Sequence, residues 1–426
     1  MKFRFAVMFA SLLFLSAASL SRAQGAPSAN QPVKLADLLA EAEQNNPQIQ
    51  AAHHVWDAAK QVPTQVSTLP DPQIVLQHFS VGSPRPFAGY TNSDFAYFGL
   101  GFSQDIPYPG KLRLRGEIAK KDAAVIQERY ESVRRAILAE VKKTYFQLGY
   151  LSERETILDS DRELLRQVEE SAEARYRSGM GNQLEVLQAQ LEQTKLLREI
   201  TSNQLETGKI QAAIKQLLNR PQASADIQTV TLSETPLSYT FDELLAAANA
   251  NNPEIAGTRK VVERQKLQVD LAKKDFYPDF NLQYMWQRTD PAQYRAYYML
   301  TFGIRIPIYR SRRQKPELAQ AEADQNSARS ESEAQSQQVA FELRQQFVSA
   351  DKSAELLKIY RDGLLPQARA EFQAGLAAYQ SNREDFQALL ASFLDVLKID
   401  QEYWQMLSEH ETSLAQIEEA TGLSLR

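Results

Sequence analysis

The sequence has no cysteine and only four histidines among its 426 residues. The absence of cysteine excludes a disulfide framework, cysteine-ligated metal sites and lipid attachment to a cysteine after the leader. The histidines show no zinc-type spacing, because His53 and His54 are adjacent on an expected helix while His78 and His410 are isolated. A phosphate-binding loop, a nucleophile elbow and a His-Glu-x-x-His motif are also missing from the sequence. We therefore expect a protein that is not an enzyme and needs neither a metal nor a cofactor.

Beyond the first twenty residues, the chain lacks any apolar run of the length that a transmembrane helix needs. At the N-terminus, Lys2 and Arg4 precede an apolar stretch, Phe5–Leu20, and small residues follow at Ser21 and Ala23. This order predicts a secretory signal peptide over residues 1–23. Its removal takes away three basic residues, so the formal charge changes from −5 to −5 − 3 = −8. We expect no nucleic-acid partner, and any membrane insertion of the mature chain must use strands.

Several short motifs occur twice, in the same order, about two hundred residues apart. Asn-Asn-Pro occurs at 45–47 and 251–253, Ile-Pro at 106–107 and 306–307, and Tyr-x-Ser at 176–178 and 379–381. The period is too long for a solenoid repeat and indicates the duplication of a larger unit. We expect two structural repeats, residues 24–220 and 240–426, joined by a polar linker over residues 221–239. Each repeat should contain a helix, two strands and a hairpin of long helices.

The expected strand pairs, about 72–106 and about 279–308, alternate apolar and polar residues with a period of two, which is typical of strands with two different faces. Their lengths suit tilted membrane strands of about 9–11 residues. The residues expected to face lipid are Phe98, Leu100, Phe102, Leu282, Tyr284, Trp286, Tyr298, Leu300, Phe302 and Ile304. A soluble antiparallel sheet packed on helices would show the same alternation, so the strands alone leave both readings open.

The segments after the strands follow the helical period over unusual lengths. From Leu112 to about Ser178 there is no proline, and the glycines there are Gly116 and Gly149. About 65 residues at ~1.5 Å each make about 100 Å of helix, whereas an average helix has about 12 residues. A second long helix is expected from Glu317 to about Leu364. Together, the helical hairpins are predicted at about 111–218 and about 311–420.

The order of elements and the repeated motifs resemble those of the outer membrane efflux protein family, the TolC-like channels. The resemblance covers nearly the whole mature chain and rests on the strand exits at 104–111 and 305–308 and on the turns at 176–187 and 379–386. It implies a mixed α/β membrane channel that forms a homotrimer. Each copy would give four strands to one twelve-stranded outer-membrane β-barrel, and the long helices would form an α-helical barrel across the periplasm of a Gram-negative bacterium.

The resemblance also implies a function and partners. The protein would be the passive outer-membrane conduit of a tripartite efflux pump, exporting small molecules or metal ions that an inner-membrane transporter and a periplasmic adaptor deliver. The alternative is a periplasmic helical tether or adaptor-like protein without a membrane barrel, which would not need four membrane-grade strands.

Three groups of candidate functional residues follow. The turns lie farthest from the expected barrel, so we place a gate there at Arg383, Glu384 and Asp385, because Gln387 and Leu390 stand where family members often carry acids. The residues expected to dock an adaptor at the turns are Tyr176, Ser178, Gly179, Gly181, Tyr379, Ser381 and Asn382. The basic residues expected to reach lipid headgroups after the strands are Lys111, Arg113, Arg115, Arg310, Arg312 and Arg313.

Overall fold

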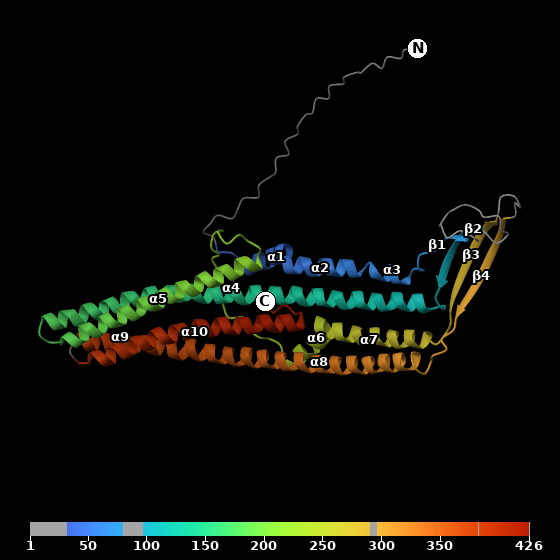
Figure 1. Ribbon diagram of the computed structural model, residues 1–426. Coiled ribbons are helices and arrows are strands. Elements are labelled where there is room, and N and C mark those ends of the chain that lie inside the picture. The colour runs from blue at the N-terminus through green and yellow to red at the C-terminus, as the bar shows by residue number, and fades with distance from the viewer. Residues whose placement is uncertain (1–31, 80–96, 290–295, 382, 426) are drawn as a thin grey trace, which may run out of the picture.

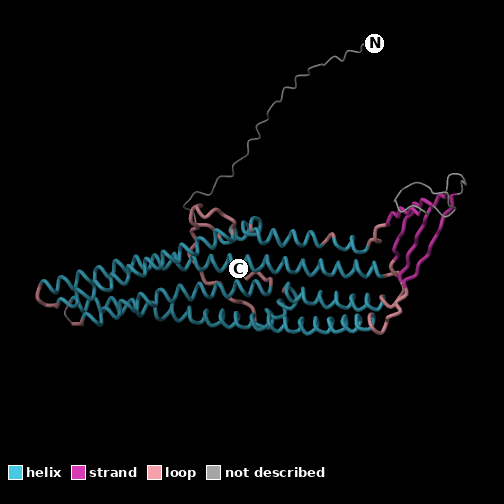
Figure 2. Tube along the Cα trace, in the orientation of Figure 1, coloured by secondary structure: helices cyan, strands magenta, loops and turns pink. Residues whose placement is uncertain are grey.

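The computed structural model describes residues 32–79, 97–289, 296–381 and 383–425. The expected signal peptide, residues 1–23, lies outside them, and so does Asn382 of the second turn. The described molecule is long and narrow, with a four-stranded sheet at one end and the tips of two helical hairpins at the other (Figures 1 and 2).

The chain runs through two sets of elements in the same order. The first set comprises α1 (Leu35–Asn45), α2 (Pro47–Ala59), α3 (Val62–Ser67), β1 (Gln73–Phe79), β2 (Tyr97–Ile106), α4 (Lys111–Arg177) and α5 (Gln183–Leu217). The second comprises α6 (Phe241–Asn251), α7 (Pro253–Lys274), β3 (Asp279–Thr289), β4 (Ala296–Arg305), α8 (Gln314–Ile359), a π-helical turn (Tyr360–Leu364), α9 (Leu365–Gln380) and α10 (Phe386–Thr421). Between the sets, residues 221–239 contain no helix, and Thr229 forms an isolated parallel bridge with Val33.

The two Asn-Pro pairs break the first helix of each set and attach it to the rest of the molecule. The side-chain oxygen of Asn46 accepts a hydrogen bond of 2.9 Å from the backbone amide of Gln48, so it caps α2. Its side-chain amide donates to the carbonyl oxygen of Leu217, at 2.8 Å. Asn252 repeats both contacts: it caps α7 and donates to the carbonyl oxygen of Ala420, at 3.0 Å. Each asparagine therefore ties a helix break to the end of the returning hairpin helix.

The second long helix extends beyond the expected end near Leu364. Helical backbone continues through the π-helical turn into α9 and ends at Gln380. Pro366 explains the local change of winding, because proline has no amide hydrogen and its ring clashes with the normal helical ladder. The corresponding helix of the first set, α4, runs without interruption for 67 residues.

The apolar stripes of the helices pack into separate clusters along the length of the molecule. One cluster joins both hairpins in the half nearer the tips and includes Leu165, Leu196, Phe372 and Phe393. Two others form where α1 and α6 pack against the long helices. Because no cluster is wide, the helices bury narrow stripes and leave much of their surface exposed. Within the described chain, no helix is both long and apolar enough to cross a membrane.

The sheet is antiparallel with the strand order β1-β2-β3-β4. Strands that are adjacent in sequence within each set pair with each other, and β2 pairs with β3 across the two sets. Gly101 makes the β2–β3 pairing possible, because a Cβ atom there would lie 2.3 Å from the carbonyl oxygen of Tyr284.

Candidate functional site

The strand register places all ten of the expected lipid-facing residues on one side of the sheet. Across β2 and β3, Leu100 lies opposite Trp286 and Phe102 opposite Tyr284. Across β3 and β4, Tyr284 is in turn opposite Leu300. Since side chains alternate between faces along each strand, the paired positions extend one apolar surface across the whole sheet. We call this surface the apolar face. Its ten expected members are Phe98, Leu100, Phe102, Leu282, Tyr284, Trp286, Tyr298, Leu300, Phe302 and Ile304.

The apolar face is exposed in the single chain, although aromatic stacking covers part of it. Tyr284 stacks on Tyr298 with ring centroids 6.2 Å apart and lies 5.9 Å from the ring of Phe102. Leu300 and Phe302 still expose 61% and 62% of their surface. The opposite face carries mainly small and polar residues, and it also carries two methionines and two tyrosines: Gly99, Gly101, Ser103, Asn281, Gln283, Gln287, Thr301 and Gly303, with Met285, Met299, Tyr97 and Tyr297. An exposed apolar face of this size points to contact with lipid or with another protein.

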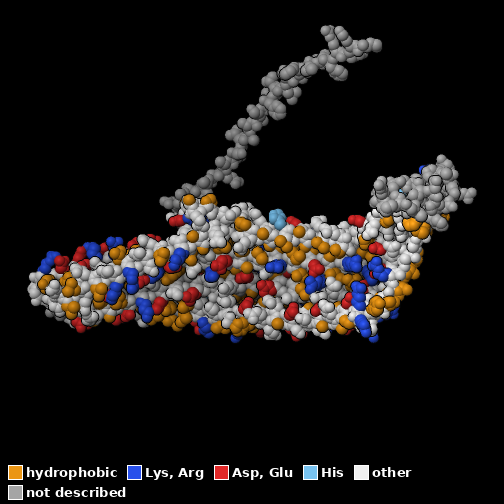
Figure 3. Space-filling model, viewed as in Figure 1, with side chains coloured by type: hydrophobic (Ala, Val, Ile, Leu, Met, Phe, Trp, Pro, Cys, Tyr) orange, Lys and Arg blue, Asp and Glu red, His pale blue; other side chains and the backbone are white. Residues whose placement is uncertain are grey.

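The basic residues that follow the strands separate into two groups. Lysine and arginine side chains gather where the helices meet the sheet (Figure 3). Arg113 and Arg313 are exposed there and each pairs with a glutamate one turn later, Glu117 and Glu317. Arg115, Arg310 and Arg312 are also exposed.

Lys111 differs from the prediction that it reaches lipid headgroups. Its side chain is only 4% exposed, and its ammonium group lies 2.9 Å from Asp279 and 3.0 Å from Asp275. The backbone amide of Tyr108 also donates to Asp279, at 2.8 Å. The helix starts beside these two carboxylates, so the ammonium group turns inward. Lys111 therefore ties the start of α4 to the end of α7 and the start of β3.

The two hairpin tips are built alike. Asn182 caps α5 by accepting from the backbone amide of Glu185, at 3.1 Å, and Asp385 caps α10 by accepting from that of Ala388, at 2.8 Å. In the first tip, Gly179 adopts φ of +73°, which favours glycine. Ser178 and Ser381 bond to carbonyl oxygens of their own helices.

Of the residues expected to dock an adaptor, Tyr379 is placed differently from the prediction. Its side chain is fully buried, and its hydroxyl donates a hydrogen bond of 2.7 Å to Glu185. Arg175 donates to its carbonyl oxygen, at 2.6 Å, and the guanidinium lies 4.4 Å from the centre of its ring. Burial and the Glu185 carboxylate raise the pKa of the Tyr379 hydroxyl. Tyr379 therefore joins the two tips within the chain, whereas Tyr176, Ser178, Gly179 and Ser381 stay exposed and Gly181 is half-buried.

The expected gate residues lie together at the second tip. Arg383 and Glu384 are exposed, and Asp385 is exposed while it caps α10. In the part of the chain that the structure describes, Arg383 forms no ion pair with either acid. Gln387 bonds to Gln188 on the other hairpin, at 2.6 Å, and Leu390 is buried.

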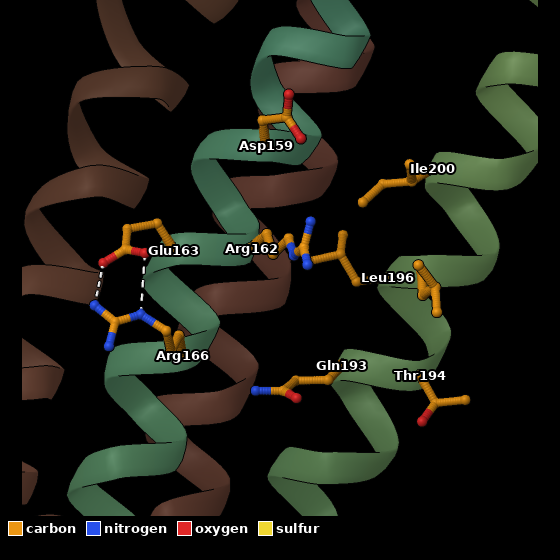
Figure 4. A pocket seen from close by; sticks show the side chains of 9 residues that line it. Asp159, Arg162, Glu163, Arg166, Gln193, Thr194, Leu196 and Ile200 are labelled. Carbon is orange, nitrogen blue, oxygen red and sulfur yellow. Dashed lines mark hydrogen bonds and ion pairs between the residues drawn. The ribbon is translucent and has the colours of Figure 1, made fainter.

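A hollow of about 630 Å³ lies between α4 and α5 (Figure 4). Arg162 points from α4 toward Leu196 on α5, and beside it Glu163 pairs with Arg166 at 2.5 Å. Ion pairs at this spacing are ordinary on a helix surface, and Leu196 belongs to the cluster between the hairpins. The hollow is therefore a groove between packed helices.

His53 and His54 lie closer together than their adjacency on a helix suggested. Their ring nitrogens and the Asp57 carboxylate lie within 4.8 Å of one another, which suits a metal ion. The same carboxylate already bonds to Lys60, at 2.6 Å, and to His53, at 3.1 Å. A cation there would compete with the Lys60 ammonium group for the carboxylate.

Sequence reasoning missed the residues that connect the two hairpins. Arg175 directly precedes the turn motif that begins at Tyr176, but nothing in its neighbours indicates that it crosses to the other tip. Asp161 and Asp400 are acidic residues in long polar helices, yet only 2% and 7% of their surface is exposed. An interruption of the apolar spacing in α4 at Asp161 is the only signal that the sequence offers.

The comparisons with known proteins agree with this architecture. The model of the family described as "Outer membrane efflux protein" matches residues 38–220 and 244–422. The multidrug resistance outer membrane protein MdtQ of Escherichia coli is 25% identical over 375 residues, which cover 81% of this chain and 78% of MdtQ. The putative MdtQ of Shigella flexneri is 24% identical over the same shares.

Solved structures show the same fold. The outer-membrane channel OprN superposes with a TM-score of 0.79 at 19% identity, covering 92% of this chain and 90% of OprN. The outer membrane protein VceC from Vibrio cholerae superposes with a TM-score of 0.78 at 18% identity, covering 92% of this chain and 97% of VceC. CusC, described as forming a transmembrane channel, superposes with a TM-score of 0.79 at 18% identity, covering 92% of each chain.

Proposed function

The chain belongs to the outer membrane efflux protein family, and on that premise we propose that three copies join their sheets into one twelve-stranded barrel, with the apolar face outward in the lipid. The protein is an outer-membrane efflux channel. The observation that carries the proposal is the strand register, which gathers the ten apolar residues on one face and mainly small and polar residues on the other. This two-sided pattern suits a wall between lipid and a water-filled lumen.

The sheet edges support assembly from several chains. In the described sheet, β1 and β4 are the outermost strands, so each has one edge without a strand partner. Open edges are not tolerated in lipid, because their amide and carbonyl groups find no hydrogen bonds there. An even number of strands per chain lets β4 of one copy meet β1 of the next in antiparallel sense. An eight-stranded barrel is filled by its own side chains, so a third copy is needed for a wider lumen.

The helices and the basic residues fit the same arrangement. The long helices would line a tunnel on the periplasmic side. At its junction with the barrel, the five exposed arginines Arg113, Arg115, Arg310, Arg312 and Arg313 would reach lipid headgroups, since arginine can lay its stem along apolar surface and keep its charge in water.

The hairpin tips would hold the gate and the docking surface for a periplasmic adaptor. They lie farthest from the sheet (Figure 1), where a small rotation of a long helix moves its end farthest. The Tyr379–Glu185 bond joins the two hairpins, and Arg383, Glu384 and Asp385 would meet across the threefold axis. The exposed docking residues would be Tyr176, Ser178, Gly179 and Ser381. Through the adaptor, an inner-membrane transporter would deliver small molecules or metal ions.

Reconstitution tests the proposal directly. The purified full-length protein should form stepwise conductances in planar bilayers, and it should require detergent for extraction from outer membranes. A strain without this gene should become sensitive to some of the metals, dyes and drugs in a susceptibility screen. Extraction without detergent, together with no conductance, would favour the periplasmic tether instead.

A further inference from the structure

Two buried carboxylates interact where the hairpins pack, about three-quarters of the way along α4 and before the middle of α10. Asp161 of α4 is 2% exposed and Asp400 of α10 is 7% exposed. The Oδ2 atom of Asp161 is buried and accepts no hydrogen bond within the described chain. Leu158 and Leu165, about one turn away on either side of Asp161, belong to the apolar cluster between the hairpins. A charged, unpaired carboxylate is costly in such surroundings.

The charged groups that act on Asp161 come from two other helices. Asp400 on α10 repels its charge, and Arg369 on α9 attracts it. Arg369 bonds to Asp400, at 2.8 Å, and its own side chain is 64% exposed. From α5, Leu196 and Ile200 contribute apolar side chains to the same cluster. One partly solvated guanidinium therefore has to compensate for two carboxylates.

These surroundings favour the neutral form of Asp161. Burial and the charge of Asp400 raise the pKa of Asp161 to about 7, against the influence of Arg369. Burial also raises the pKa of Asp400, and Arg369 opposes that rise. If the hairpins separated, water would reach both carboxylates and their pKa values would return toward the ordinary range near 3.9.

A change in helix geometry lies at the same level of the second hairpin. The two turn motifs are offset by 379 − 176 = 203 residues, so Asp161 corresponds to position 161 + 203 = 364. Leu364 is the last residue of the π-helical turn, and Pro366 follows it. Prolines and π-helical turns are common places for helices to bend. From Asp161 to the tip, α4 continues for 16 residues, or about 24 Å of helix.

We propose that Asp161, Asp400 and Arg369 form a proton-dependent latch between the two hairpins, with the π-helical turn as the hinge of the second. With a proton bound, α4 and α10 stay packed and the tips stay together. When the proton is lost, the two carboxylates repel each other and α9 and α10 swing away from α4. The latch rests on the proposed gating role of the tips, and it adds control of the gate by periplasmic pH.

The direction of the pH effect follows from proton linkage. The packed state holds a proton that the separated state releases, so acid favours packing and alkali favours separation. The equilibrium toward separation should rise by up to about tenfold per pH unit between about pH 4 and pH 7, and it should level off above pH 7.

Two measurements on the full-length protein test the latch. Open probability in planar bilayers should rise with pH over this window in the parent, while Asp161→Asn should stay mostly closed and show a much weaker slope. Spin labels at Met180→Cys and Ser381→Cys, in a chain without native cysteine, should report tip separation over the same window in detergent. Asp159→Asn is the matched control, because Asp159 lies two residues away on the exposed rim of the groove in Figure 4.

The two measurements distinguish failure of the latch from failure of the channel. If no conductance appears, the channel proposal fails, and the spin-label distances still test the latch. Asp400→Asn provides a second variant in case Asp161→Asn does not fold, and it should shift the transition to lower pH. Tip distances in Asp161→Asn that depend on pH as in the parent, or parent distances that do not depend on pH, would overturn the latch.

Discussion

The hydroxyl of Tyr379 on α9 donates a hydrogen bond of 2.7 Å to the carboxylate of Glu185 on α5. This bond crosses from one hairpin tip to the other, between residues 194 positions apart in the sequence. Tyr379 is fully buried and Glu185 is half-buried, so water has limited access to the bond. Together with the bonds from Arg175 to the Tyr379 carbonyl oxygen and from Gln387 to Gln188, it joins the two tips.

Replacement of Tyr379 by phenylalanine should loosen the tips. A hydrogen bond to a charged group contributes about 1.5–3 kcal/mol, so Tyr379→Phe should raise the open probability in planar bilayers at least several-fold. Tyr176→Phe is the matched control, since Tyr176 occupies the equivalent position of the first tip and is exposed. Equal open probabilities for Tyr379→Phe and the parent would remove this bond from the gate.

Charge reversal at the second tip tests the expected gate residues. Arg383→Glu would place three acidic side chains in succession on each copy, and three copies would bring them together. We expect a higher open probability and greater sensitivity of cells to large antibiotics. Arg177→Glu, at the first tip, serves for comparison because Arg177 is exposed and paired with Glu173. Conductance and permeability like those of the parent would exclude Arg383 from the gate while leaving the channel assignment intact.

The lipid contact of the apolar face can be tested with two adjacent residues of β4. Leu300→Arg should destabilise the membrane-inserted barrel by about 2–4 kcal/mol if Leu300 lies near the bilayer midplane. It should also reduce heat-resistant assembly in outer membranes. Thr301→Arg is the control, because its side chain belongs to the opposite, polar face and should assemble normally. Equal assembly of the two variants would argue for a sheet that does not contact lipid.

Lys111 should matter for stability more than its exposed neighbours. Its ammonium group is nearly buried between Asp275 and Asp279, and Lys111→Ala would leave the two carboxylates facing each other. Removal of one partner from a buried ion pair costs about 3–5 kcal/mol. Since both carboxylates are partly exposed, we expect Lys111→Ala to lower the free energy of unfolding by about 1–3 kcal/mol. Arg113→Ala, which breaks an exposed pair with Glu117, should change thermal stability little; equal losses would contradict the internal role of Lys111.

The sequence was sufficient for the fold because its patterns are local and occur twice. The Asn-Pro pairs cap helices within three residues, and the two-residue alternation of the strands decides which residues share a face. Lys111 and Tyr379 could not be placed in this way. Their surroundings are set by Asp279 and Glu185, which are more than 160 residues distant from them. A local pattern carries no information on such contacts.

The most direct test of the central claim is a cross-link between the outer strands of neighbouring copies. In one sheet, β1 and β4 are three strand spacings apart, or about 14 Å, which is too far for a disulfide. Because the native chain has no cysteine, Val75→Cys on β1 can be combined in turn with Met299→Cys, Thr301→Cys or Gly303→Cys on β4. After oxidation of the membrane-inserted protein, one of these pairs should give a covalent trimer on a denaturing gel. Monomers from all three pairs, alongside a monomeric mass in detergent, would contradict a barrel closed by three chains.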